Sequence, residues 1–298
     1  MLARLSRMRI QYASDLHLEM SGPVAFGALL RPVAPVLVLA GDVGRPDRPG
    51  YLEMLRWAAR SWDHVVVVAG NHELYNSCDA RRWRYKPAGE IQTAEERLEG
   101  CAMAAQAAGA NVHFLERQRV DIHGWAFLGC TLWSEVAESS EAATINDYRL
   151  IAVSPDKPAT PADTTAWHRR DRAWLQEALA VCAEEEQPVV VVTHHLPSYE
   201  LIAARYADSP LNSAFASECD DLIRPPVRGW IAGHTHVGTT RIMGGDIQVG
   251  VNPRGYLGET GTGYCRELFM DLARPTSGGG GSSTADPLLR AASAEVTS

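Results

Sequence analysis

The sequence predicts an α/β protein whose strands deliver polar side chains to one edge of a sheet. Short β-branched apolar runs alternate with segments of helical periodicity along the 298 residues. Four of these runs break directly into clusters of Asp, Asn and His, and a fifth, shorter run does the same. Because ligands of α/β sheets bind beyond the carboxyl ends of strands, we expect the five clusters to meet at one polar site.

The five runs, which are expected to be buried strands, are 10–14, 36–40, 65–69, 189–193 and 230–232. The clusters that follow them are Asp15-Leu16-His17, Gly41-Asp42, Gly70-Asn71-His72-Glu73, His194-His195 and Gly233-His234-Thr235-His236. Apolar runs of this length, bounded by turn residues, are typical of strands that are covered on both faces.

Three segments have the pattern of helices. Apolar residues recur with helical spacing over 51–62. The Ala-rich segment 93–108 opens with Thr93 and Glu96, which have the spacing of a capping box. The third helix is expected over 160–185, because a Thr-Pro pair at its start supplies a cap and a first-turn proline.

The remaining elements are expected to be strands. The runs 112–115, 119–122 and 125–128 have the spacing of a β-meander. A hairpin is predicted over 240–251 around a Gly-Gly-Asp turn, and a last strand over 265–272.

The boundaries follow from composition. Residues 74–92 are interpreted as a loop over the site. We expect one domain over 1–274 and a flexible Ser/Gly-rich tail over 275–298.

Composition excludes several classes of function. The net charge of −8 argues against an extended nucleic acid as partner, although a small phosphate ester remains compatible because bound cations would supply positive charge. No apolar stretch is long enough to span a bilayer. The six cysteines are scattered and no apolar run follows the first arginines, so we expect a cytoplasmic protein with unpaired thiols.

The donor types in the clusters indicate a metal site. Carboxylate and amide oxygens and imidazole nitrogens are all present, and clustered thiolates are not. Asp15 and His17 are two residues apart, so their side chains leave an extended segment on the same side, and the same holds for His234 and His236. Asn71 offers a neutral oxygen that limits the negative charge placed on a cation.

The ordered motifs D-x-H, G-D, G-N-H-E, H-H and G-H-x-H resemble those of the calcineurin-like metallophosphoesterases. They extend over 15–236 and so cover most of the chain. The resemblance implies a two-sheet β-sandwich flanked by helices, a four-layer α/β fold, with a dinuclear metal centre at the strand ends. It implies a first metal held by Asp15, His17 and His236, and a second held by Asn71, His194 and His234, with Asp42 bridging the two ions.

The resemblance also implies a mechanism, in which a hydroxide bridging the two metal ions attacks phosphorus. Asp42 and His72 are then the catalytic candidates, with His72 meeting the phosphate or the leaving group as a general acid, or alternatively orienting a neighbour. Two divalent or mixed-valence ions are expected; manganese is favoured, and Fe, Zn, Co or Ni also fit these ligands.

The sequence favours a small phosphodiester as substrate and leaves alternatives open. The same centre would serve a phosphomonoesterase acting on a protein or a small molecule. A non-catalytic binding scaffold of the same fold is expected to have lost ligands, and here none is missing. Arg254 and Arg149 are candidate substrate-binding residues, since guanidinium groups suit phosphate. His195 is a third candidate; it is interpreted as lining the pocket or supporting a ligand, with His194 favoured over it as the metal ligand. For the two arginines, anchoring of their loops is an equally supported interpretation.

Overall fold

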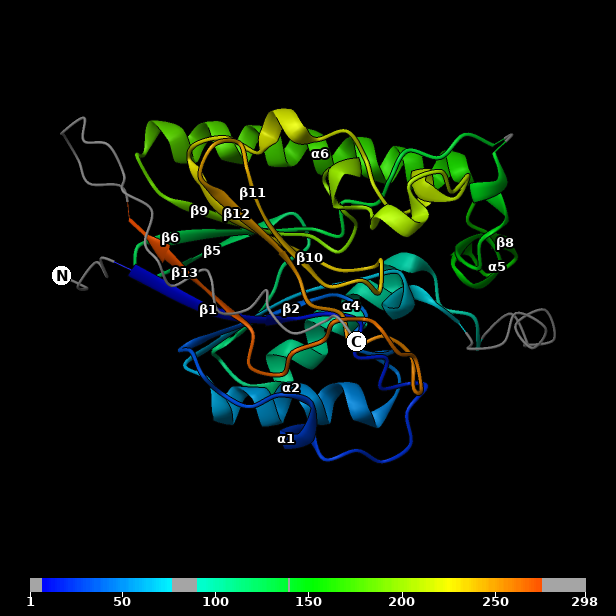
Figure 1. Ribbon diagram of the computed structural model, residues 1–298. Coiled ribbons are helices and arrows are strands. Elements are labelled where there is room, and N and C mark those ends of the chain that lie inside the picture. The colour runs from blue at the N-terminus through cyan, green and yellow to red at the C-terminus, as the bar shows by residue number, and fades with distance from the viewer. Residues whose placement is uncertain (1–6, 77–89, 139, 275–298) are drawn as a thin grey trace, which may run out of the picture.

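The structure is a computed structural model that describes residues 7–76, 90–138 and 140–274. Two mixed sheets pack face to face and helices cover their outer faces, so the fold has four layers (Figure 1). The first sheet has the strand order β13-β1-β2-β3-β4 and the second the order β11-β12-β10-β9-β6-β5. The predicted sandwich flanked by helices is confirmed.

The strands of the first sheet are β1 (Arg7–Ala13), β2 (Val36–Ala40), β3 (His64–Val68), β4 (Val112–Phe114) and β13 (Phe269–Ala273). Those of the second are β5 (Gln118–Ile122), β6 (Trp125–Gly129), β9 (Val189–Val192), β10 (Val227–Ala232), β11 (Thr239–Met243) and β12 (Ile247–Val251). Strands β1 to β4 pair in parallel, as do β6, β9, β10 and β12. Their carboxyl ends therefore share one edge of each sheet.

The long helices are α2 (Pro49–Ser61), α4 (Ala94–Ala108) and α6 (Pro161–Glu184). Helices α2 and α4 pack on the outer face of the first sheet, and α6 on that of the second (Figure 1). Both α4 and α6 begin with a capping box, Thr93 with Glu96 and Thr160 with Asp163. The three helices confirm the predicted ones to within two residues at either end.

Short elements complete the described chain. They are the helices α1 (Phe26–Leu29) and α5 (Asp147–Leu150), the strands β7 (Ala152–Ser154) and β8 (Lys157–Pro158), and the 3-10 turns His72–Leu74, Glu141–Thr144, Tyr199–Leu201, Ala204–Tyr206, Asn212–Ala214 and Asp220–Leu222. None of the helices in the described ranges is long and apolar enough to cross a membrane.

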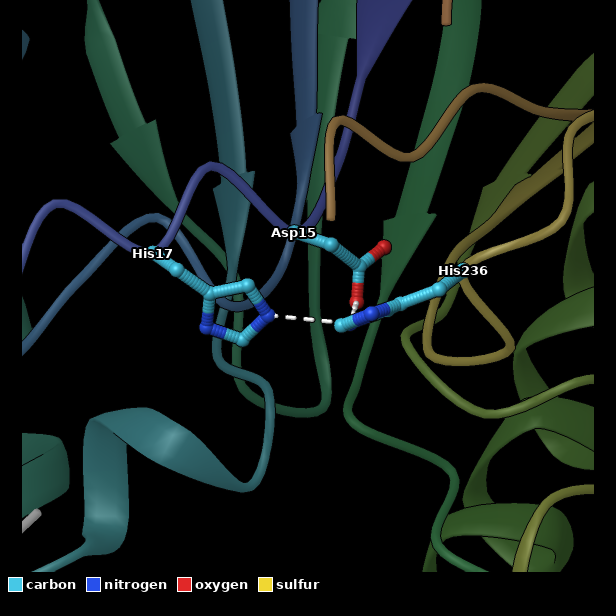
Figure 2. Close-up of side chains that lie close together, drawn as sticks. All are labelled: Asp15, His17 and His236. Atoms are coloured by element: carbon cyan, nitrogen blue, oxygen red, sulfur yellow. Dashed lines mark hydrogen bonds and ion pairs between the residues drawn. The ribbon is translucent and has the colours of Figure 1, made fainter. Parts of the chain in front are cut away.

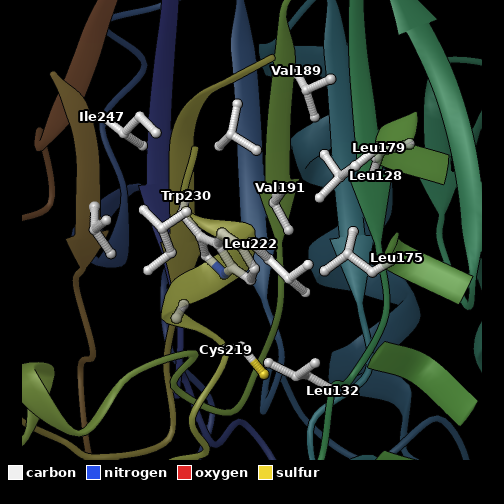
Figure 3. Packing of buried hydrophobic residues seen from close by; sticks show 14 of the residues in the cluster. Leu128, Leu132, Leu175, Leu179, Val189, Val191, Cys219, Leu222, Trp230 and Ile247 are labelled. Carbon is white, nitrogen blue, oxygen red and sulfur yellow. The ribbon is translucent and has the colours of Figure 1, made fainter. Parts of the chain in front are cut away.

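Three apolar layers hold the sandwich together. The layer under α6 is built from that helix and from strands of the second sheet, with Leu175 and Leu179 packed over Leu128, Val189 and Val191 (Figure 3). A second layer fills the space between the sheets, and a third lies under α2 and α4. Strands β2 and β9 are buried along their whole length, as expected for parallel strands covered on both faces.

The predicted β-meander is wrong. Strand β4 pairs in parallel with β3 in the first sheet, whereas β5 and β6 form a hairpin in the second. The chain passes from one sheet to the other between Phe114 and Gln118, where Arg117 has a left-handed backbone (φ 52°). Alternating apolar residues show that a segment is a strand, but they do not show which sheet it joins.

The other strand predictions are confirmed at β11 and β12, and the last strand begins at Phe269, four residues later than expected. The five described cysteines are free, and all except Cys265 are buried. Most of the loop expected at 74–92 (residues 77–89), and the tail 275–298, lie outside the described residues.

Candidate metal centre

The carboxyl ends of β1, β2 and β3 in the first sheet meet those of β9 and β10 in the second sheet at one edge of the sandwich. Each strand is followed within three residues by one candidate ligand, and these are Asp15, Asp42, Asn71, His194 and His234. All five are buried. His17 and His236 follow two residues after Asp15 and His234, so the structure brings all seven predicted ligands to one place.

The backbone turns sharply at this edge. Five of the seven candidates have left-handed φ angles, namely Asp15 (54°), His17 (47°), Asp42 (52°), His234 (73°) and His236 (51°). Such a conformation costs about 1–3 kcal/mol for a residue other than glycine, and it persists where the surrounding structure enforces it, commonly at functional sites. At these residues the backbone turns away from the strand direction, so their side chains stay close to the strand ends.

The first cluster contains Asp15, His17 and His236 (Figure 2). One donor atom from each lies within 4.8 Å of the others. His17 Nε2 and His236 Nε2 are 3.0 Å apart, and His236 Nε2 is 3.4 Å from Asp15 Oδ1. Three donor atoms of the type that binds divalent cations thus face one another.

The second cluster contains Asp42, His194 and His234, whose donor atoms also lie within 4.8 Å of one another. Asn71 joins it, because its Oδ1 is 3.1 Å from His194 Nε2. Asp42 Oδ2 lies 3.5 Å from His194 Nε2 and 3.8 Å from His17 Nε2. The Asp42 carboxylate therefore sits between the two clusters.

Hydrogen bonds fix which atoms point inward. His194 Nδ1 donates to the carbonyl of Ala40 (2.8 Å), which leaves its Nε2 facing the cluster. His236 Nδ1 donates to Glu259 (2.7 Å) and His17 Nδ1 to Glu19 (3.2 Å), with the same consequence for their Nε2 atoms. Carboxylates and carbonyls behind the ligating rings are typical of metal sites, where they set the tautomer and the ring orientation.

Asn71 is oriented in the same manner. Its Nδ2 donates to Asp147 (2.8 Å) and to the hydroxyl of Tyr75 (3.0 Å), so its Oδ1 is the atom that faces His194. Tyr75 also donates to Asp147, at 2.5 Å. A carboxylate, an amide and a phenol thus fix one neutral oxygen at the second cluster.

Sequence reasoning missed the three orienting carboxylates Glu19, Asp147 and Glu259. Glu19 lies two residues after His17, a spacing that could have drawn attention to it. Asp147 lies two residues before Arg149, and of the two only the arginine is a sequence-predicted candidate. For Glu259 the sequence holds no signal, since its role depends on a loop that returns to the site from beyond β12.

The ionisation of the site reflects opposite charges held close together. Burial opposes ionisation of Glu19, but the two histidines bonded to it lower its pKa to about 2. Despite burial, Asp42 raises the pKa of His194 to about 10. Burial and the nearby His194 lower the pKa of His234 to about 3. In the metal-free protein His194 is therefore protonated near neutral pH and His234 is neutral, and binding of a cation by His194 would release its proton.

His72 lies beside the clusters. Its Nδ1 donates to Glu19 Oε1 (2.9 Å), its Nε2 is 3.2 Å from the hydroxyl of Tyr256, and its backbone N–H donates to Asp42 Oδ1 (2.9 Å). His72, His17 and Glu19 also form a group with donor atoms within 4.8 Å of one another, which their direct hydrogen bonds to Glu19 explain. His72 lines a cavity of about 350 Å³ that opens onto the second cluster.

The predicted substrate-binding residues lie elsewhere. Arg254 donates to the carbonyl of Leu16 (2.6 Å) and to Ser21 (3.1 Å), contacts that anchor its loop. Arg149 is exposed, and neither arginine is among the described residues that line the cavity. His195 is buried behind His234, with ring centroids 4.2 Å apart, and it too lies off the described cavity wall.

A comparison with models of protein families shows the family to which this chain belongs. A family model described as calcineurin-like phosphoesterase matches residues 8–238. The chain belongs to this family. Membership in the calcineurin-like phosphoesterases supports metal-dependent hydrolysis of phosphate esters, with the His and Asp residues above as candidate ligands.

The individual proteins that resemble this chain have low sequence identity to it. An uncharacterized protein of Acanthamoeba polyphaga mimivirus is 27% identical over 272 residues, which are 84% of this chain and 92% of the relative. The structure of a phosphopantetheinyl hydrolase from Mycobacterium tuberculosis matches with a TM-score of 0.61 and 20% identity, covering 84% of this chain and 90% of that one. A dimetal phosphatase from Danio rerio matches with a TM-score of 0.49 and 14% identity over 90% and 99% of the two chains.

Proposed function

We propose that the two clusters hold two metal ions and that the protein hydrolyses a phosphodiester at them. In this proposal the first ion is bound by Asp15, His17 and His236, the second by Asn71, His194 and His234, and Asp42 bridges both. The observation that carries it is the position of Asp42 Oδ2, which lies within 4 Å of a ring nitrogen from each cluster. The donor set of imidazole, carboxylate and one amide oxygen fits divalent or mixed-valence ions, and we favour Mn²⁺.

The residues around the ions have separate tasks. Bound metal ions would supply a hydroxide near neutral pH and offset the charge on the phosphoryl oxygens. His72, placed beside Asp42 and held at Nδ1 by Glu19, is positioned to donate a proton from Nε2 to the leaving oxygen. Although burial opposes it, the carboxylates of Asp42 and Glu19 raise the pKa of His72, which favours the protonated form that this role requires.

The charge of the cavity favours a diester over a monoester. A phosphomonoester carries close to two negative charges at neutral pH, and a diester carries one. Two bound cations would supply positive charge for either ester, and the described residues that line the cavity add neither a lysine nor an arginine to bind the further charged oxygen of a monoester. Phosphomonoesterase activity on a protein or a small molecule is the alternative on the same centre.

The test compares two chromogenic substrates. Metal-stripped protein reloaded with Mn²⁺ is assayed on bis(p-nitrophenyl) phosphate and on p-nitrophenyl phosphate. We expect faster turnover of the diester, loss of most activity in Asp42→Ala, and a lower kcat in His72→Ala with its metal content retained.

The other results each overturn a part of the proposal. Preference for the monoester would indicate a phosphatase, and normal turnover in His72→Ala would remove its role as an acid. Failure to hydrolyse either substrate with any of Mn, Fe, Zn, Co or Ni would favour a binding scaffold. The expected cytoplasmic location stays a prediction.

A further inference from the structure

The cavity beside the metal clusters has two unlike ends. At the inner end it is lined by the clusters themselves, through Asp42, Asn71 and His234. Part of the remaining wall, called the outer wall below, comes from the segment 202–215, which follows β9 and contains short 3-10 turns. A substrate with its phosphate at the metal ions would place an organic arm against this segment.

The outer wall is apolar. Ile202, Leu211 and Phe215 line it, and each is partly buried. The Phe215 ring stacks on His234, with centroids 4.6 Å apart, so the apolar side chains of this wall reach the second cluster. A cavity of about 150 Å³ is enough for benzene, so a cavity of about 350 Å³ is of a size to accept a phosphate at its inner end together with an aromatic arm.

The polar groups on the wall are neutral or already bonded. The amide nitrogen of Asn212 donates to the carbonyls of Tyr206 and Ala207 (2.7 and 3.1 Å). The carboxylates of Asp147 and Glu259 accept hydrogen bonds from Asn71 and His236. An anionic arm entering this space would lose its hydration without meeting a lysine or an arginine among the described lining residues.

We propose that the arm of the substrate is apolar and carries no negative charge, and that Leu211 is a residue that determines this specificity. The inference rests on the proposed phosphodiesterase function and narrows its substrate to esters of aromatic or similarly apolar alcohols. Esters whose arm carries a further phosphate or a carboxylate are poor substrates. Leu211 is the position at which to test this, because it lies outside the apolar clusters of the described core and its side chain faces the cavity.

The experiment uses two symmetric diesters, so that either arm can enter the cavity with the same result. Mn²⁺-loaded protein is assayed on diphenyl phosphate and on bis(4-carboxyphenyl) phosphate by chromatography of the released phenols. We expect kcat/KM to be about tenfold or more higher for diphenyl phosphate, because the carboxylate is desolvated against an apolar wall. Leu211→Arg places a cation on that wall and should reduce or reverse the preference, while Met103→Arg, an exposed apolar position on α4, should leave it unchanged.

Two further measurements separate the possible failures. Hydrolysis of bis(p-nitrophenyl) phosphate by the same preparation tests the proposed function alone, and its absence would overturn both claims. If that diester is cleaved but the two symmetric diesters are cleaved equally well, the specificity proposal is wrong. Should Leu211→Arg not fold, Leu211→Ala replaces it, with the expectation of a raised KM for diphenyl phosphate at nearly unchanged kcat; an unchanged KM would overturn the role of Leu211.

Discussion

Gly41 shows how closely the backbone of the site is packed around its ligands. It lies between β2 and Asp42 with φ of 82°, and a Cβ added there would collide with the ring of His194 and lie 2.8 Å from the backbone nitrogen of Gly70. The ring cannot swing aside freely, because its Nδ1 is bonded to the carbonyl of Ala40. Gly41→Ala therefore adds both backbone strain and a steric conflict inside the metal centre.

The two costs can be added from general magnitudes. A left-handed conformation costs an alanine about 1–2 kcal/mol. Overpacking a well-packed interior costs about 1–3 kcal/mol. We therefore expect the free energy of unfolding of the metal-free protein to fall by about 2–5 kcal/mol, measured by urea denaturation. The affinity of the second cluster for its proposed metal ion should fall as well, because His194 is displaced.

Two other glycines serve as matched controls. Gly245 has φ of 96°, but an added Cβ would meet nothing within 4 Å, so Gly245→Ala carries the strain without the collision. Gly22 also faces open space and its φ is outside the left-handed range, so Gly22→Ala should change the stability by no more than about 0.5 kcal/mol. If Gly41→Ala costs no more than Gly245→Ala, the close packing of His194 against the β2 turn is refuted.

Three other substitutions test separate parts of the structure. Glu19→Gln should weaken metal binding about 10–100-fold by titration calorimetry, since it disturbs the acceptor behind two histidines, and unchanged affinity would deny that role. Asp47 accepts hydrogen bonds from the buried Arg45 and Arg97, which lower the pKa of its carboxyl group although partial burial opposes this. The stability that Asp47 contributes is therefore present above its pKa in the unfolded chain, about 4, and is lost as the pH falls through its lower pKa in the folded protein. Asp47→Asn should lower the free energy of unfolding by about 2–4 kcal/mol at pH 7, less than for a fully buried pair because the Asp47 side chain is one-third exposed. It should also reduce the loss of stability between neutral and acidic pH, and an unchanged loss would contradict this role. Leu175→Ala should cost about 2–5 kcal/mol in denaturant, and a cost under about 1 kcal/mol would contradict its place in the layer under α6.

The clusters of candidate ligands could be anticipated from the sequence because they depend on local order. Asp15, Asp42 and His194 each follow an apolar run directly, and parallel strands bring their carboxyl ends together whatever the loops between them do. The capping box at Thr93 is likewise contained within four residues. Wherever a feature depends on neighbours in sequence and on the general geometry of sheets, the sequence was sufficient.

Features that depend on distant contacts could not be anticipated. Asp147 orients Asn71 from 76 residues away, through a short helix that no periodicity marks. Strand β4 pairs with β3 in the first sheet, and the chain passes to the second sheet only after β4. The residues of β4 alone do not show which of the two sheets it joins. The segment 202–215 has no strand or helix pattern, so its place on the cavity wall was visible only in the structure.

The central claim is that this chain holds two metal ions joined by Asp42, and a metal count tests it most directly. Protein stripped of metal, reloaded with Mn²⁺ and passed through a desalting column is analysed by elemental mass spectrometry beside Asp42→Ala and His72→Ala. We predict two ions per chain in the unsubstituted protein and in His72→Ala, and one or fewer in Asp42→Ala. A single ion in the unsubstituted protein, or two retained without Asp42, would contradict the bridged centre.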